Sequence, residues 1–113
     1  MKIGNLKSSI LFLLFVYLGM ENSPELKTLI RNNAHLFWYT KDSEKENLPL
    51  PVVLEFFLNY ADETEVKKLI KMVGLKKTAF LFFKQINKSE RMANNFNPLA
   101  KNFFNLYFAK YAR

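Results

Sequence analysis

Acidic residues of one short segment and a single histidine are the side chains of this chain best suited to catalysis or metal binding. Asp42, Glu44 and Glu46 stand at every second position, a spacing at which carboxylates can bind a hard cation. Lysines alternate with them and no glycine turns the chain between them, so we interpret this segment as a solvated loop. His35 would need a nucleophile and an orienting acid to act as a general base, and no pattern supplies either. We therefore predict no catalytic residue and no metal site.

Cysteine is absent from the 113 residues, and histidine occurs once. The first absence excludes disulfides, zinc–thiolate sites, iron–sulfur clusters and a cysteine nucleophile, and the second excludes a site of several histidines. Half of the residues are hydrophobic and 24% are charged, which suits a chain that buries a core. The composition therefore predicts a globular, non-enzymatic protein that holds no cofactor.

Positive charge is concentrated in the C-terminal part of the chain. The formal net charge is +7, and the surplus of lysine and asparagine over arginine, glycine and alanine is typical of an AT-rich genome. Residues 1–70 carry eight basic and nine acidic side chains, whereas residues 71–113 carry nine basic side chains and Glu90 alone as an acid. Codon bias does not predict this asymmetry, but a half that faces an anionic partner would show it.

A helix–Gly–helix unit near residues 63–86 lies at the start of this basic part. Gly74, with Phe80 and Phe83 six and nine positions later, has the spacing of a helix-turn-helix motif, although Ile70 stands where close helix packing favours a small residue. An ordinary helical hairpin with solvated lysines is the alternative. The side chains predicted to face outward, toward phosphates or bases, are Lys76, Lys77, Thr78, Lys84, Gln85, Lys88 and Arg91.

Aromatic residues form two groups that suggest a partner surface. One group is consecutive, at positions 37–39, where the rings can anchor the core, meet a partner or stack on bases. The other lies at positions 96–108 and exceeds what one helix face can bury, so some of these rings are expected to meet another chain. The predicted partner interface consists of Phe37, Trp38, Tyr39, Phe104 and Tyr107.

Helices are the elements that must position these side chains. Ser23-Pro24 and Asn97-Pro98 each combine a cap with proline at the first helical position, and Asp62 with Glu65 has the spacing of a capping box. Helices are expected at about 24–33, 51–60, 62–73, 76–86 and 98–112, with exposed loops at 40–47 and 87–97. No segment alternates like a strand, so the sequence predicts an all-α fold, a compact bundle of about five short helices.

The inward faces of the last two helices follow from the positions of their apolar residues. Ala79, Phe80, Phe83 and Ile86 are expected to point inward from the helix at 76–86, which is apolar nearly all round. For the last helix, the expected buried side consists of Leu99, Phe103, Leu106 and Phe108.

A hydrophobic leader precedes this predicted domain. The apolar run from Ile10 to Met20 follows two lysines and is too short to span a bilayer, which takes about 20 residues. Its length and basic flank suit a signal peptide, but Tyr17 stands where a small residue is expected before cleavage. Translation from Met20 and a helix packed on the body are the alternatives. We divide the chain into a leader, 1–19, and a single helical domain, 20–113.

Several short motifs resemble those of a small uncharacterised bacterial family of helical proteins. They are the string His35-Leu36-Phe37-Trp38, the helix junction Phe57–Asp62, the segment Val66–Gly74, and Asn97-Pro98 through Phe103-Phe104 and Tyr107. The resemblance covers about residues 30–110, and Ala61 stands where a glycine is common in the family. Members are often encoded beside nucleotidyltransferase-like toxins of the abortive-infection type. The resemblance therefore implies an antitoxin or accessory role and carries over no catalytic residue.

The leading hypothesis is a non-enzymatic cytoplasmic protein that binds a macromolecule, as an antitoxin-like partner of a neighbouring nucleotidyltransferase. The aromatic groups would meet a protein, either the toxin or a second copy, and the lysine-rich half would contact DNA or RNA. The alternatives are helix-turn-helix-like DNA binding through the unit near 63–86 and a membrane-associated or exported protein, which depends on residues 1–20 alone.

Overall fold

The chain folds into helices, as the sequence predicts. A computed structural model describes residues 22–112, and within this range no strand forms. Five helices of 9 to 14 residues make up most of the fold, and three four-residue segments lie between them. The elements are α2 (Pro24–Asn32), the 3-10 helix η1 (Ala34–Phe37), α3 (Asp42–Lys45), α4 (Leu50–Tyr60), α5 (Glu63–Val73), α6 (Leu75–Lys88), α7 (Glu90–Ala93) and α8 (Pro98–Tyr111).

Three helices begin at the polar caps that the sequence predicts. The side chains of Ser23, Asp62 and Asn97 each accept a hydrogen bond from the backbone N–H three residues later, at 3.2, 3.0 and 2.7 Å. Prolines occupy the first turns of α2 and α8, where their missing N–H removes no helical hydrogen bond. These caps satisfy amide groups that the first helical turn otherwise leaves without a partner.

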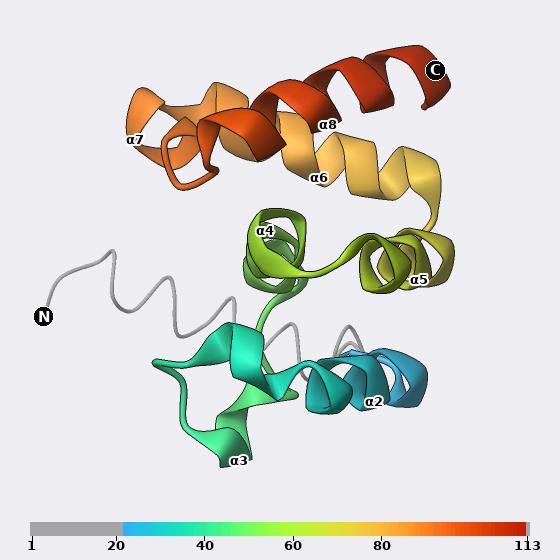
Figure 1. Cartoon of the computed structure of the whole chain (residues 1–113), viewed down its shortest axis with the longest axis vertical. Helices are drawn as coiled ribbons and strands as arrows, with labels where there is room; N and C mark the ends of the chain where they lie inside the picture. Colours follow the sequence, from blue (N-terminus) through green and yellow to red (C-terminus); the bar gives the residue numbers. More distant parts are fainter. Residues whose placement is uncertain (1–21, 113) are drawn as a thin grey trace, which may run out of the picture.

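The helices are arranged in three layers (Figure 1). One outer layer contains α2, η1 and α3, the middle layer contains α4 and α5, and the other outer layer contains α6, α7 and α8. Helix α5 packs against α2 on one side and α6 on the other, and α4 contacts both α6 and α8. The core therefore runs through all three layers, and the outward sides of α6 and α8 form the surface at one end of the stack.

Phenylalanine rings pack together in the core on both sides of the middle layer. Phe37 lies 5.2 Å from Phe56, ring centroid to ring centroid, where η1 meets α4. On the other side, Phe82 of α6 lies 5.2 Å from Phe96 and 5.4 Å from Phe108. Burial of each such ring stabilises the fold by roughly 1.5–3 kcal/mol relative to exposure.

The two segments expected as exposed loops are more ordered than the sequence suggests. Residues 40–47 contain α3, and Lys45 within it is buried, with its Nζ donating to the Ala34 carbonyl at 3.0 Å. Residues 87–97 contain α7 and the buried ring of Phe96. Both segments are mostly exposed, as predicted, but each contains a short helix and one buried side chain that the sequence did not predict.

Four of the large side chains expected to point inward are exposed instead. Phe80 of α6 and Leu99, Phe103 and Leu106 of α8 face solvent, and Phe83 is only partly buried. Both helices carry apolar residues over so much of their circumference that periodicity alone does not identify the buried face. In α6, packing selects the face that carries Phe82.

Within residues 22–112, no helix combines the length and the apolar character needed to cross a bilayer. The predicted leader, residues 1–19, lies outside the part of the chain that the structure describes.

Candidate nucleic-acid interface

The outward side of α6 presents a basic face. We use this name for Lys76, Lys77, Phe80, Lys84 and Lys88, all of which are exposed. With 3.6 residues per turn, these side chains fall within an arc of about 120°, and the stripe from Lys76 to Lys88 is about 18 Å long. Arg91 of α7 is also exposed, three residues beyond the end of α6.

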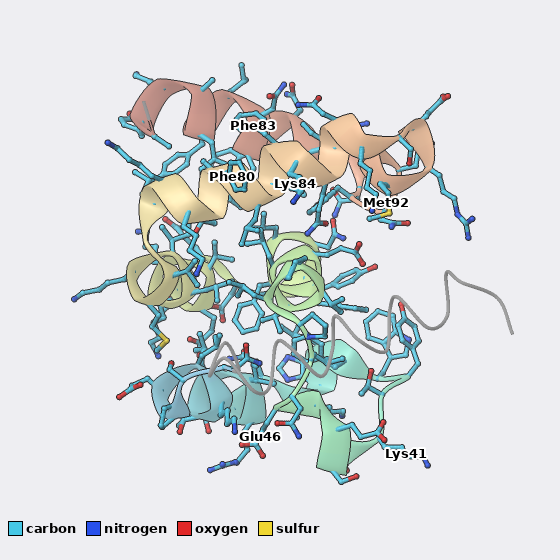
Figure 2. The ribbon with its side chains drawn as sticks, turned by 180° about the vertical axis from the view of Figure 1, so that it is seen from behind. Lys41, Glu46, Phe80, Phe83, Lys84 and Met92 are labelled. Carbon is cyan, nitrogen blue, oxygen red and sulfur yellow. The ribbon has the colours of Figure 1, made fainter. Side chains whose placement is uncertain are left out.

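Phe80 is an exposed aromatic ring in the middle of these cations. Figure 2 shows Phe80 and Lys84 as neighbours on α6, and the Lys84 Nζ lies 5.9 Å from the Phe80 ring centroid. The ring is 63% exposed, although an apolar side chain of this size is usually buried. Phe80, Phe83, Lys84, Asn87 and Lys88 line an open depression of about 600 Å³.

Acidic side chains neutralise cations elsewhere in the molecule but not on the basic face. The ion pairs Arg31–Glu46, Lys45–Asp42, Lys67–Glu63 and Lys68–Glu65, with N–O distances of 2.7 to 3.2 Å, all lie in the segment from α2 to α5. In residues 71–112 the sole acidic side chain is Glu90, and none of the four lysines of the basic face forms an ion pair with a described residue. Their charges therefore add to a positive potential at this end of the molecule.

The structure corrects two of the predicted outward residues. Lys76, Lys77, Lys84, Lys88 and Arg91 are exposed, as predicted. Thr78 and Gln85 are buried, so the prediction that they face outward is wrong. Both polar groups have hydrogen-bond partners, because the Thr78 hydroxyl donates to the Gly74 carbonyl at 2.7 Å and Gln85 Nε2 donates to the Pro51 carbonyl at 2.8 Å.

The turn between α5 and α6 departs from a helix-turn-helix motif. A helix-turn-helix has a turn of three or four residues, whereas Gly74 alone separates Val73 from Leu75 here. Gly74 has φ 99° and ψ 139°, a conformation that L-residues rarely adopt. The unit is a tight helical corner whose second helix is exposed along one side.

A second exposed cluster, which we call the aromatic patch, consists of Trp38, Tyr39 and Tyr60 around the buried ring of Phe56. The Trp38 centroid lies 4.8 Å from Tyr39, 5.8 Å from Phe56 and 5.2 Å from Tyr60. Trp38 and Tyr39 are exposed, as an interface requires, and Tyr60 joins them from the end of α4. Sequence reasoning missed Tyr60, because only the fold brings α4 beside η1.

Two of the five predicted interface residues belong to the core. Phe37 is fully buried between Phe56 and Phe57, and Phe104 is buried 6.4 Å from Phe82. Their assignment to a partner surface is therefore wrong. Tyr107 is partly buried, at the edge of a groove between α5 and α8.

Two of the three carboxylates of the acidic segment, Asp42 and Glu46, form ion pairs. Asp42 pairs with Lys45 at 2.8 Å and Glu46 pairs with Arg31 at 2.7 Å. The hydrogen bond and charge of Lys45 lower the pKa of Asp42. Within the described residues, no group of three or more His, Asp and Glu side chains is placed to hold a metal ion.

Glu55 is a titratable group that the sequence analysis did not single out. Partial burial on α4 raises the pKa of its carboxyl group, and a hydrogen bond with Asn95 opposes this effect. Glu55 shares a pocket of about 290 Å³ with Lys84, Lys88 and Met92. In the sequence, Glu55 could have been recognised as the one acidic residue among the apolar residues of the helix predicted at 51–60.

Comparisons of the chain with models of protein families, with curated proteins and with solved structures found no match.

Proposed function

We infer that this protein is a non-enzymatic macromolecule-binding protein that binds single-stranded nucleic acid through the basic face of α6. The observation that carries this proposal is a stripe of lysines that form no ion pair with any described residue, with the exposed ring of Phe80 at its centre. Lysines supply the sequence-independent attraction to phosphates that dominates affinity for nucleic acids. Exposed aromatic rings supply the stacking surface on which unpaired bases rest.

The chemistry of the face favours a single strand over sequence-specific duplex reading. Direct reading of base pairs relies on the planar forks of arginine and on amide side chains, and no arginine lies on the exposed side of α6. Gln85, which could have read a base, is buried and bonded to Pro51. A ring flanked by point charges binds phosphates and any base, so we expect little sequence preference.

The test is fluorescence anisotropy with labelled oligonucleotides. The protein is expected to bind short single-stranded DNA and RNA more tightly than a duplex of equal length, with affinity falling steeply from about 50 to about 200 mM salt. Phe80→Ala is expected to weaken binding by about 5- to 150-fold, the equivalent of one lost base stack at 1–3 kcal/mol. The matched control is Tyr39→Ala, which removes an exposed ring from another layer. Equal affinity for both forms of nucleic acid, or an unchanged Phe80→Ala variant, would contradict the proposal.

A second candidate function is favoured by the aromatic patch. Trp38, Tyr39 and Tyr60 expose three rings of the kinds most enriched at the energetic centres of protein interfaces. Together with the family resemblance, they support an antitoxin-like accessory role in the cytoplasm, in which this patch binds a neighbouring nucleotidyltransferase. This candidate and nucleic-acid binding are compatible, because they use different layers of the molecule.

Co-expression with the product of the adjacent gene tests this second candidate. An affinity-tagged chain is expected to capture that product, and the double variant Trp38→Ala, Tyr39→Ala is expected to lose it. Phe80→Ala serves as the control that keeps the aromatic patch intact. No association between the two co-expressed proteins would refute the antitoxin role, and equal capture by the double variant would show that the patch is not the interface.

A further inference from the structure

Helix α8 exposes an apolar ridge on its outer side. Leu99, Phe103 and Leu106 are 85%, 58% and 64% exposed, and their spacing of four and three residues places them on one face. Lys110 completes the same face one turn later, with its Nζ 5.2 Å from the ring centroid of Tyr111. We call Leu99, Phe103 and Leu106 the α8 ridge.

A groove runs directly beside this ridge, between α5 and α8. It has a volume of about 400 Å³, and its walls are mostly apolar. Phe103 belongs both to the ridge and to the groove wall, and its ring stacks on Tyr107 with a centroid distance of 5.9 Å and an interplanar angle of 15°. The lining residues are Leu58, Ala61, Glu63, Val66, Lys67, Ile70, Phe103, Phe104 and Tyr107.

The apolar part of α8 is about twice as wide as its core contact requires. At 100° per residue, apolar side chains cover an arc of about 200° from Leu106 through Phe103 and Tyr107 to Phe108, and Lys110 is the one charged residue within it. Only Phe104 and Phe108, at one end of this arc, are buried. A helix that packs on a single core carries a narrower stripe, of about 100°. The remaining half of the arc is therefore available for a second packing partner.

We propose that two copies of this chain associate through α8, with the ridge of each copy lying in the groove of the other. The ridge and the groove are adjacent on the same surface and share Phe103, which is the arrangement that a two-fold interface requires. A partner helix with anchors at i, i+4 and i+7 is also the shape that an apolar groove between helices accepts. The chain thus supplies both halves of one interface.

The exposed area approaches that of a small specific interface. At roughly 200 Å² for each large apolar side chain, the exposed parts of Leu99, Phe103 and Leu106 amount to about 400 Å². Two-fold symmetry doubles this to about 800 Å², and the walls of the two grooves raise it toward the roughly 1,000 Å² of a specific interface. A patch of this size is as large as the largest apolar patch of a typical monomeric protein.

Charge also favours α8 as the occupant of the groove. Helix α8 carries Lys101 and Lys110 and no acidic residue. Exposed Asp62, the N-cap of α5, stands between the lining residues Ala61 and Glu63 and forms no ion pair with another described residue, whereas Glu63 pairs with Lys67 at 2.9 Å. A cation on the α8 of a second copy can therefore pair with Asp62, and this attraction weakens with salt.

Molar mass measured by light scattering on the full chain tests the proposal. Between ~1 and ~200 µM protein, the mass is expected to rise toward twice the chain mass of 13.4 kDa. Leu106→Glu places a charge in the interface and is expected to give a monomer at all of these concentrations. Phe80→Glu is the matched control, because it adds the same charge at an equally exposed apolar side chain on α6, and it is expected to leave dimerisation intact. A wild-type monomer throughout, or a dimer that Leu106→Glu does not dissociate, would overturn the proposal.

The absence of cysteine allows a second, independent measurement. Phe103→Cys introduces a single thiol at the residue that the ridge and the groove share, which the proposed arrangement places nearest the two-fold axis, so the thiols of two copies can come within the distance that a disulfide spans. Mild oxidation is expected to cross-link this variant into a dimer on a non-reducing gel. Lys77→Cys, on the basic face, is expected to stay monomeric. Cross-linking of both variants to the same extent would indicate random collision and contradict the proposed interface.

Discussion

Neutralising three lysines of the basic face is expected to change how nucleic-acid binding depends on salt. The variant Lys76→Gln, Lys84→Gln, Lys88→Gln keeps these exposed side chains polar and leaves the core untouched. Each lysine that contacts a phosphate displaces counterions from the strand, so the salt dependence counts contacts. The slope is therefore more informative than the affinity at one salt concentration.

The magnitude follows from the number of cations at this end of the molecule. If Lys76, Lys77, Lys84, Lys88 and Arg91 each contact one phosphate of a single strand, log K falls with log salt at a slope of about −3.5, and the triple variant retains about −1.4. From about 50 to about 200 mM salt, the wild-type affinity should fall on the order of 100-fold and the variant affinity about 7-fold. Anisotropy titrations with one labelled oligonucleotide at four salt concentrations measure both slopes.

A control variant separates the basic face from net charge. Lys41→Gln, Lys67→Gln, Lys68→Gln removes the same three charges from exposed positions outside α6, two of which are ion-paired on α5. This control is expected to keep a slope near the wild-type value. If both triple variants lower the slope equally, binding depends on total charge and our reasoning about α6 is refuted. Circular dichroism and the melting temperature show whether each variant remains folded.

Four further predictions concern stability and processing. Gly74→Ala is expected to lower the free energy of unfolding by about 1–3 kcal/mol, because φ is 99° although no atom lies within 4 Å of the added Cβ, and thermal melting measures this. Phe82→Ala should cost about 3–5 kcal/mol in a urea titration, since the ring is fully buried among Phe96 and Phe108. Burial raises the pKa of Glu55, so the ionised carboxylate destabilises the fold at neutral pH. Glu55→Gln should therefore raise the melting temperature at pH 7. This gain should disappear as the pH falls below the ordinary carboxyl pKa, where Glu55 is protonated in both the folded and the unfolded state. If Met20 is the functional start, intact-mass measurement of the native protein should show a chain that begins there.

The helix boundaries could be predicted because their signals are local. A cap such as Asp62 and the apolar spacing from Val66 to Val73 require only the neighbouring residues, and the structure contains both features. The orientation of α6 could not be predicted in the same way. Apolar residues occur among its lysines as well as opposite them, so the choice of Phe82 over Phe80 as the buried ring depends on the packing of α4 and α8.

The burial of polar side chains and the hydrogen bonds between distant residues also could not be predicted from the sequence. Thr78 and Gln85 resemble surface residues in the sequence, but their hydrogen bonds to Gly74 and Pro51 make burial inexpensive. The exposed segment before α8 is also held by hydrogen bonds to a distant residue, because Asn59 accepts from the Asn97 N–H at 2.9 Å and donates to the Asn95 carbonyl at 2.9 Å. The two bonds of Asn59 join residues 36 and 38 positions apart, a separation that local patterns do not encode.

Of the candidate surfaces, the basic face could be predicted from sequence more fully than the aromatic patch. Lysine charges are costly to bury, so lysines usually lie on the surface, and the exposure of four lysines of α6 was predicted correctly. The aromatic patch needed the contact between η1 and α4, which brings Tyr60 to within 5.2 Å of Trp38. Sequence therefore predicted the charge of one surface and only part of the composition of the other.

The separation of charge between layers gives the molecule a permanent electric dipole. Residues 22–70 carry six basic and eight acidic side chains, whereas residues 71–112 carry eight basic side chains and one acid. In the field of a polyanion, such a molecule rotates during diffusion, so that the layer of α6 to α8 approaches first. Orientation before contact increases the fraction of collisions that are productive, and the layer that contains α2 then points toward solvent, where the molecule can meet another partner.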